Sequence, residues 1–135
     1  MAIADGDTLT VLDENKTQHK IRLSGIDAPE RAQPFGQRSK EYLSMLVFGK
    51  TIEVETAKLD RYKRTLGKIV LDGRDVNLAM LVAGLAWHYK KYEREQSAAD
   101  RLLYDDAEKA ARLAGRGLWK DAGHVPPWEW RVGLR

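Results

Sequence analysis

The residues best suited to chemistry are carboxylates in two short segments near the start of the chain. Residues 5–7 (Asp-Gly-Asp) precede a β-prone stretch, and residues 27–30 (Asp-Ala-Pro-Glu) follow a second one. If the two stretches pair as a hairpin, Asp7, Asp27 and Glu30 converge at one end of it. Carboxylates without nearby His or Cys select a hard cation such as Ca²⁺ or Mg²⁺. Each segment alone is equally typical of a polar turn.

Basic and aromatic side chains supply a second kind of chemistry. Arg22 alternates with Ile21 and Leu23, so its side chain points to the opposite face. That face is either plain surface or the wall of a cleft, where a guanidinium group can bind phosphate oxygens. Residues 60–64 (Asp-Arg-Tyr-Lys-Arg) and 89–92 (Tyr-Lys-Lys-Tyr) mix aromatic rings with cations, which suits nucleic acid. Either segment alone is also typical of an exposed loop.

Short strands and helices must position these residues. Alternation and turn signals predict strands at 8–12, 20–23, 51–55, 66–71 and 85–89. Helical spacing predicts helices at 36–48, 75–83 and from 97 to about 114. Asp75 and Ser97 are the expected N-caps, and the tail at 126–130 is expected to pack back on the domain. This pattern fits a small barrel of the oligonucleotide-binding kind or an open sheet.

Composition sets the outer limits. The 135 residues are 43% hydrophobic and 32% charged, which is typical of one globular domain spanning residues 1–135. The net charge of +3 permits nucleic acid as a partner without requiring it. The absence of cysteine excludes disulfides and thiolate metal sites. No membrane-spanning run and no signal peptide are visible in the numbered chain.

Taken together, the segments resemble the staphylococcal nuclease family from Asp5 to about Trp119. Their order along the chain makes the resemblance specific, although each motif alone is weak. The three signature segments are 5–8 (Asp-Gly-Asp-Thr), 22–30 (Arg-Leu-Ser-Gly-Ile-Asp-Ala-Pro-Glu) and 60–64. Three structural landmarks follow at 76–77 (Val-Asn), 84–86 (Gly-Leu-Ala) and 117–119 (Gly-Leu-Trp).

The resemblance implies a mainly β fold with helices, an OB-fold Greek-key barrel of five strands carrying three α-helices. It implies a Ca²⁺-dependent phosphodiesterase that hydrolyses single-stranded or locally opened DNA and RNA, acts as a monomer, and is secreted or periplasmic. The alternative is a non-catalytic module of the same fold that binds nucleic acid or protein. Degenerate modules of this kind typically lose the acidic and arginine positions, whereas all of them are present here.

The resemblance also implies three groups of site residues. Ca²⁺ would be held by Asp7, Asp27 and the backbone carbonyl of Ala28. The reacting groups would be Glu30, which positions or deprotonates the attacking water, and the phosphate-binding Arg22 and Arg64. The nucleotide would be contacted by Tyr62, Lys63, Tyr89 and Tyr92.

The sequence departs from the family pattern at three places. Ala28 replaces a hydroxylated residue, which costs little if only its carbonyl is used. Lys63 stands where the family usually has glycine, so the loop either adopts a strained left-handed backbone or relaxes into an ordinary conformation. We expect the ordinary conformation, because exposed loops adapt readily. The strand before Asp5 is expected to be nearly absent.

Overall fold

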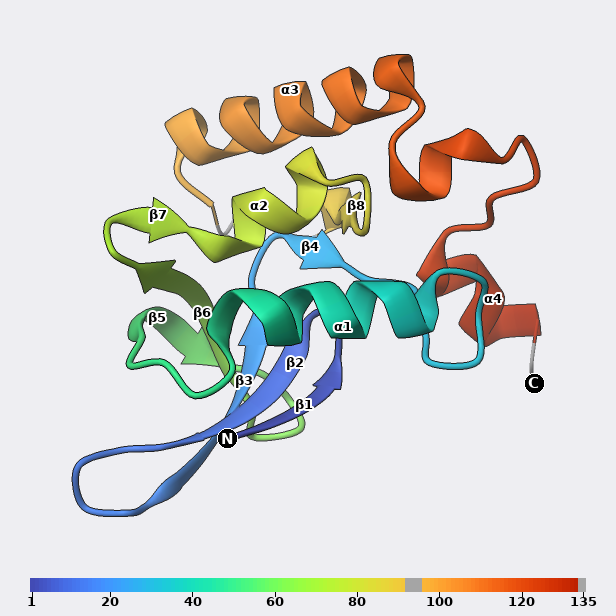
Figure 1. The fold of residues 1–135 in the computed structure, drawn as a ribbon. Helices are drawn as coiled ribbons and strands as arrows, with labels where there is room; N and C mark the ends of the chain where they lie inside the picture. Colours follow the sequence, from blue (N-terminus) through green and yellow to red (C-terminus); the bar gives the residue numbers. More distant parts are fainter. Residues whose placement is uncertain (92–95, 134–135) are drawn as a thin grey trace.

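The computed structural model describes residues 1–91 and 96–133 (Figure 1). The strands of this part are β1 (Ala2–Asp5), β2 (Thr8–Leu12), β3 (Gln18–Leu23), β4 (Ile26–Asp27), β5 (Glu53–Leu59), β6 (Thr65–Leu71), β7 (Arg74–Asp75) and β8 (Trp87–His88). The helices are α1 (Gly36–Val47), α2 (Val76–Val82), α3 (Ala98–Ala114), the 3₁₀ helix η2 (Gly117–Lys120) and α4 (Pro127–Gly133).

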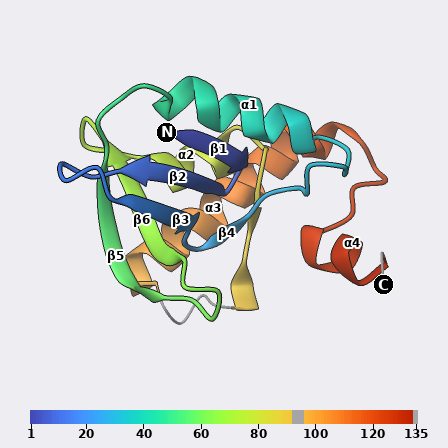
Figure 2. The ribbon, with the colours of Figure 1, turned by 90° about the horizontal axis from the view of Figure 1, so that it is seen from below.

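The main sheet has the strand order β1-β2-β3-β6-β5 (Figure 2). Strand β7 lies off this path and pairs with the end of β6. Neighbouring strands are antiparallel except for β3 and β6, which run parallel with Ile21 opposite Thr65. A separate pair joins β4 to β8, with Asp27 opposite Trp87. Between β3 and its parallel neighbour β6, the chain passes through β4, α1 and β5.

The core lies between the main sheet and the first three helices. Leu9, Ile21 and Leu23 alternate along their strands and are buried, as the predicted hairpin requires. Helix α1 adds Leu43 and Val47 to the same cluster. Arg22 therefore lies on the opposite face of β3 from the core.

Buried polar side chains fix the helices to the sheet. Asn77, at the start of α2, is fully buried; its Oδ1 accepts from the Ile69 amide at 3.1 Å. Its Nδ2 donates to the carbonyls of Ser24 and Gly67, at 2.9 and 3.1 Å. Each polar atom of this side chain is therefore satisfied, and the turn between β3 and β4 is tied to α2. That turn leads directly into Asp27.

The expected helix starts are confirmed. The Asp75 side chain accepts from the Leu78 amide at 2.9 Å, and that of Ser97 accepts from the Asp100 amide at 3.0 Å. The predicted strands are also present, although β5 runs on to Leu59 and the strand expected at 85–89 is limited to Trp87–His88. Within the part of the chain described, no helix is long and apolar enough to cross a membrane.

Two expectations about the fold need correction. The strand before Asp5 is present as β1, because a tight turn returns the chain so that Ala2 pairs with Thr10. The described residues form four α-helices where three were expected, since the tail folds into α4. Trp128 of α4 stacks on Tyr89, with ring centroids 5.3 Å apart. The expectation that the tail packs back on the domain is therefore confirmed.

Candidate active site

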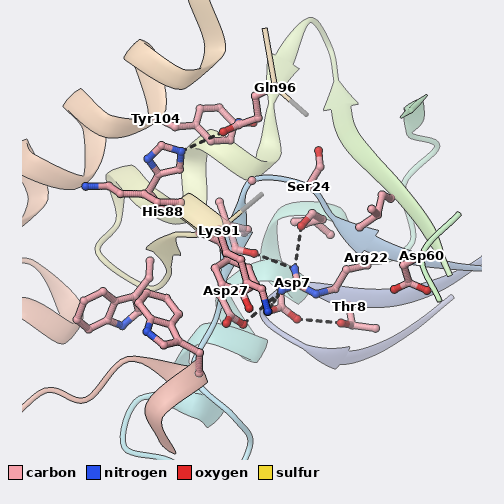
Figure 3. Close-up of a pocket in the computed structure, with 18 of the residues that line it drawn as sticks. Asp7, Thr8, Arg22, Ser24, Asp27, Asp60, His88, Lys91, Gln96 and Tyr104 are labelled. Atoms are coloured by element: carbon pink, nitrogen blue, oxygen red, sulfur yellow. Dashed lines mark hydrogen bonds and ion pairs between the residues drawn. The ribbon is translucent and has the colours of Figure 1, made fainter. Parts of the chain in front are cut away.

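A cleft of about 1260 Å³ opens beside the first hairpin (Figure 3). Its walls come from the hairpin, the loop between β5 and β6, the segment around β8, and helices α3 and α4. Nine of the ten site residues predicted from the sequence lie in the described part of the chain. The tenth, Tyr92, lies outside it. Those that line the cleft are Asp7, Arg22, Asp27, Glu30, Tyr62, Arg64 and Tyr89.

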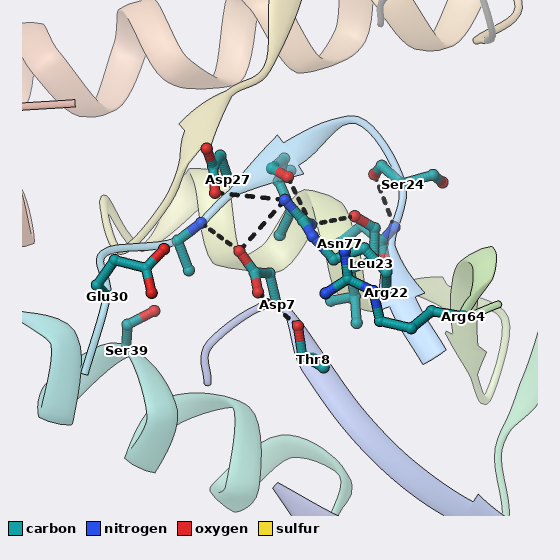
Figure 4. Close-up of polar contacts among 12 residues, drawn as sticks. Asp7, Thr8, Arg22, Leu23, Ser24, Asp27, Glu30, Ser39, Arg64 and Asn77 are labelled. Atoms are coloured by element: carbon teal, nitrogen blue, oxygen red, sulfur yellow. Dashed lines mark hydrogen bonds and ion pairs between the residues drawn. The ribbon is translucent and has the colours of Figure 1, made fainter. Parts of the chain in front are cut away.

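Asp7 and Asp27 approach the same guanidinium group from two sides (Figure 4). The Arg22 Nη2 atom lies 3.5 Å from Asp7 Oδ2 and 3.3 Å from Asp27 Oδ1. Asp7 also accepts from the Ala28 amide at 2.7 Å and from the Thr8 hydroxyl at 2.8 Å. The hairpin explains this arrangement, since Thr8 pairs with Arg22 and so places Asp7 beside it.

Arg22 is held by the backbone as well as by charge. Its Nη1 donates to the carbonyls of Leu23 and Ile26, each at 2.8 Å. These bonds fix the guanidinium plane against the turn that precedes β4. A donor fixed in this way need not reorganise when negative charge develops nearby.

Asp27 is fully buried, and burial is the main reason that its pKa is raised to about 6. The nearby Asp7 carboxylate contributes to this rise, while the hydrogen bond from Arg131 and the charges of Arg22 and Arg131 oppose it. A carboxylate in such surroundings ionises readily only when positive charge is close. Two buried acidic groups side by side are therefore suited to a cation.

Arg131 is a site residue that sequence reasoning missed. Its Nη2 lies 2.7 Å from Asp27 Oδ2, and its Nη1 lies 2.5 Å from Glu30 Oε1 and 3.3 Å from Asp27 Oδ1. Helix α4 brings this guanidinium group to carboxylates more than a hundred positions earlier in the sequence. No sequence motif predicts this contact. The tail rich in Pro and Trp contains an arginine, but nothing in its spacing assigns that arginine to the site.

The donor chemistry suits a hard divalent cation. Asp7 and Asp27 offer buried carboxylate oxygens, and neither His nor Cys joins them. No group of three or more acidic, His or Cys residues gathers closely enough to hold a metal within residues 1–91 and 96–133. The predicted convergence thus covers Asp7 and Asp27, while Glu30 is joined to Asp27 through Arg131. Backbone carbonyls or water would have to complete a coordination shell, and the role of the Ala28 carbonyl stays a prediction.

Arg64 lines the cleft from the loop between β5 and β6, where Asp60 holds it in place. Asp60 is a second residue whose role the sequence did not reveal. Asp60 Oδ1 accepts from the amides of Tyr62 and Arg64, at 2.8 and 2.9 Å. Its Oδ2 accepts from Arg64 Nε at 2.7 Å. The Arg64 guanidinium group also lies 5.3 Å from the centre of the Tyr62 ring. One carboxylate therefore shapes the turn and orients the cation.

Lys63 adopts the left-handed backbone, with φ of 63°, so the expectation of an ordinary loop conformation is wrong. The reason lies in the turn, where the Lys63 amide donates to the Asp60 carbonyl at 3.0 Å while Asp60 caps the next residues. Satisfying these bonds forces the residue before Arg64 into the region that glycine prefers. The side chain of Lys63 is exposed.

Replacing Lys63 by Gly should stabilise the fold by about 0.5–1 kcal/mol, because relief of left-handed strain outweighs the added freedom of the unfolded chain. For the Ca²⁺-dependent activity that the resemblance implies, turnover should be equal or higher and Ca²⁺ affinity should be unchanged. Urea unfolding and steady-state kinetics measure these quantities. Lys63→Ala is the matched control, since it removes the charge but keeps the strain. A large loss of turnover at saturating substrate in both variants would assign Lys63 a catalytic role.

The aromatic residues expected to contact a nucleotide differ in their surroundings. Tyr62 is 63% exposed and lies beside two arginines of its loop, Arg61 and Arg64. Tyr89 packs one face of its ring on Trp128, at an interplanar angle of 5°. The two tyrosines line the same cleft, so both can meet one bound molecule.

Comparison with known proteins places this geometry in a family. The family model described as "Staphylococcal nuclease homologue" matches residues 20–121. A Haemophilus influenzae protein named "Uncharacterized endonuclease" is 41% identical over 129 residues, covering 96% of this chain and 69% of that protein. An Escherichia coli protein of the same name is 42% identical over 130 residues, covering 96% and 80%.

A third relative carries a more specific name. The "Micrococcal nuclease" of Shigella flexneri is 37% identical over 138 residues, covering 96% of this chain and 76% of that protein. The family match spans β3 to η2 and so includes Arg22, Asp27, Glu30 and Arg64. On these matches, the chain belongs to the staphylococcal nuclease family.

Proposed function

We propose that this protein is a Ca²⁺-dependent phosphodiesterase that hydrolyses DNA and RNA with little sequence specificity. The observation that carries the proposal is the meeting, in one cleft, of two fixed guanidinium groups with a buried carboxylate pair and a third carboxylate beside it. Phosphodiester hydrolysis needs positive charge on the equatorial oxygens and a base near the attacking water. The names of the relatives, endonuclease and micrococcal nuclease, agree with this chemistry.

Asp7, Asp27 and the Ala28 carbonyl would hold the cation. When bound, Ca²⁺ would add positive charge where the phosphate gains negative charge. The deep burial of the two carboxylates supports this assignment, because buried negative charge requires compensation. The hard oxygen donors favour Ca²⁺ over zinc.

The other roles fall to side chains of the cleft walls. Arg22 and Arg64 would bind the phosphate, and each is held in place by a partner of its own. Glu30, whose side chain is 33% exposed, can meet a water molecule and would orient it or accept its proton. Tyr62, Lys63, Tyr89 and Tyr92 would contact the nucleotide.

Unpaired bases fit this cleft better than a closed duplex. The exposed ring of Tyr62 can bind a base by stacking, which requires a base that is free of its own stack. The proposed substrates are therefore single-stranded or locally opened DNA and RNA. We further propose that the strands form the five-stranded OB-fold barrel of the family, which the order β1-β2-β3-β6-β5 supports. A monomer in a secreted or periplasmic location completes the proposal.

Incubation with single-stranded DNA tests the function directly. We expect hydrolysis in Ca²⁺, and a loss of at least about a hundredfold in rate when a chelator removes it, because one divalent cation supplies several kcal/mol of transition-state stabilisation. Matched double-stranded DNA should be cut more slowly. Cleavage that persists unchanged in chelator would refute the cation site, and binding without cleavage with any divalent cation would establish the binding module instead.

A further inference from the structure

Helix α4 contributes three residues to the cleft lining, Trp128, Arg131 and Val132, from beyond the region that the family match covers. The match ends at residue 121, and α4 begins at Pro127. Trp128 stacks on Tyr89, while Arg131 reaches Asp27 and Glu30. The helix therefore has an aromatic anchor and, one turn later, a cation placed among the acidic residues.

The two arginines that contact Asp27 are held differently. Arg22 donates to two backbone carbonyls, so leaving the site would break bonds that the turn depends on. Within residues 1–91 and 96–133, the hydrogen bonds of the Arg131 guanidinium group go to the carboxylates of Asp27 and Glu30. Its side chain is 38% exposed, so it can withdraw into solvent while Trp128 stays in place. Of the two arginines, Arg131 is therefore the one that a divalent cation could displace from Asp27.

A divalent cation on Asp27 would need the same oxygens that Arg131 uses. The Arg131 Nη2 lies 2.7 Å from Asp27 Oδ2, a distance at which a second cation on that oxygen would be repelled. The same guanidinium group holds Glu30 Oε1, the oxygen that has to be available to water. Release of Arg131 would free both carboxylates in one step.

We propose that Arg131 competes with the divalent cation for Asp27, and so sets the cation concentration at which the site becomes active. The inference rests on the proposed function for the identity of the cation site. The role proposed for Arg131 is exerted through its contacts with the carboxylates of Asp27 and Glu30. It makes the cation requirement of this chain depend on a residue outside the matched region.

Calorimetric titration with Ca²⁺ tests the competition, with single-stranded DNA hydrolysis measured on the same preparations. Arg131→Gln should bind Ca²⁺ about tenfold more tightly, since at least one charge-assisted hydrogen bond no longer has to be broken. Turnover at saturating Ca²⁺ should stay within about twofold. Arg74→Gln is the matched control, because it removes the same charge from an exposed position on β7 and should leave the affinity unchanged.

The outcomes separate this inference from the function itself. An unchanged or weaker Ca²⁺ affinity in Arg131→Gln overturns the competition, even if the starting protein cleaves DNA as proposed. A large loss of turnover at saturating Ca²⁺ also overturns it, because Arg131 would then act on the phosphate. Arg131→Lys, which keeps the charge but not the planar fork, should give an intermediate affinity and serves if the Gln variant melts early. Failure of the starting protein to cut DNA, with the affinity shift intact, would count against the proposed function alone.

Discussion

Replacing Glu30 by Gln is expected to lower turnover about a thousandfold, within the range that positioned general bases contribute. Gln has nearly the same shape, so the loop should be retained, but its amide cannot accept the proton of an attacking water. The side chain is part-exposed and lies outside the core, so thermal stability should change little. Single-turnover hydrolysis of single-stranded DNA at saturating Ca²⁺ measures the effect on the reaction itself.

A second Glu→Gln change provides the control. Glu41 is exposed on α1 and accepts from Gln37, away from the cleft. Glu41→Gln should therefore match the starting protein in rate and in Ca²⁺ affinity. If Glu30→Gln kept a tenth or more of the turnover, Glu30 would not be the group that handles the water.

Replacing Arg64 by Ala should be comparably severe, with turnover lowered by about 10²–10³-fold, as for the loss of one fixed donor to a developing charge. The Asp60 carboxylate would lose its contact with Nε but would keep the amide hydrogens of Tyr62 and of residue 64. The turn should therefore persist, and the loss should come from the missing guanidinium group. Steady-state kinetics across substrate concentrations separate turnover from binding.

Arg61→Ala is the matched control, since it removes an arginine from the same loop. Arg61 donates to the Tyr62 hydroxyl at 2.8 Å and is exposed. Its loss should weaken substrate binding modestly, more so at low salt, with turnover nearly unchanged. Equal losses of turnover in the two variants would contradict the special role of Arg64.

The first hairpin and its carboxylates were predictable because their positions depend on local pairing. Thr8 lies opposite Arg22, so pairing of the two stretches also places Asp7 beside Arg22. The turn after β3 then returns Asp27 to the same point. Helix caps such as Asp75 were predictable for the same reason, since the partner is three residues away.

The residues that escaped prediction depend on contacts that no short pattern encodes. Arg131 reaches Glu30 across most of the chain, and Trp128 meets Tyr89 only after the tail has folded into a helix. The Lys63 backbone depends on how Asp60 divides its oxygens between amides and the Arg64 side chain, which composition does not reveal. Tertiary geometry decides each of these.

The parallel pairing of β3 with β6 has a consequence for how the chain folds. The β1–β2–β3 unit joins neighbouring segments and closes short loops, whereas placing Ile21 beside Thr65 must first close a long one at a high entropic cost. Arg22 belongs to the early unit, and Arg64 immediately precedes β6. We therefore expect the two arginines to meet only at the slow, nonlocal step, so that the cleft forms together with the final closure of the sheet.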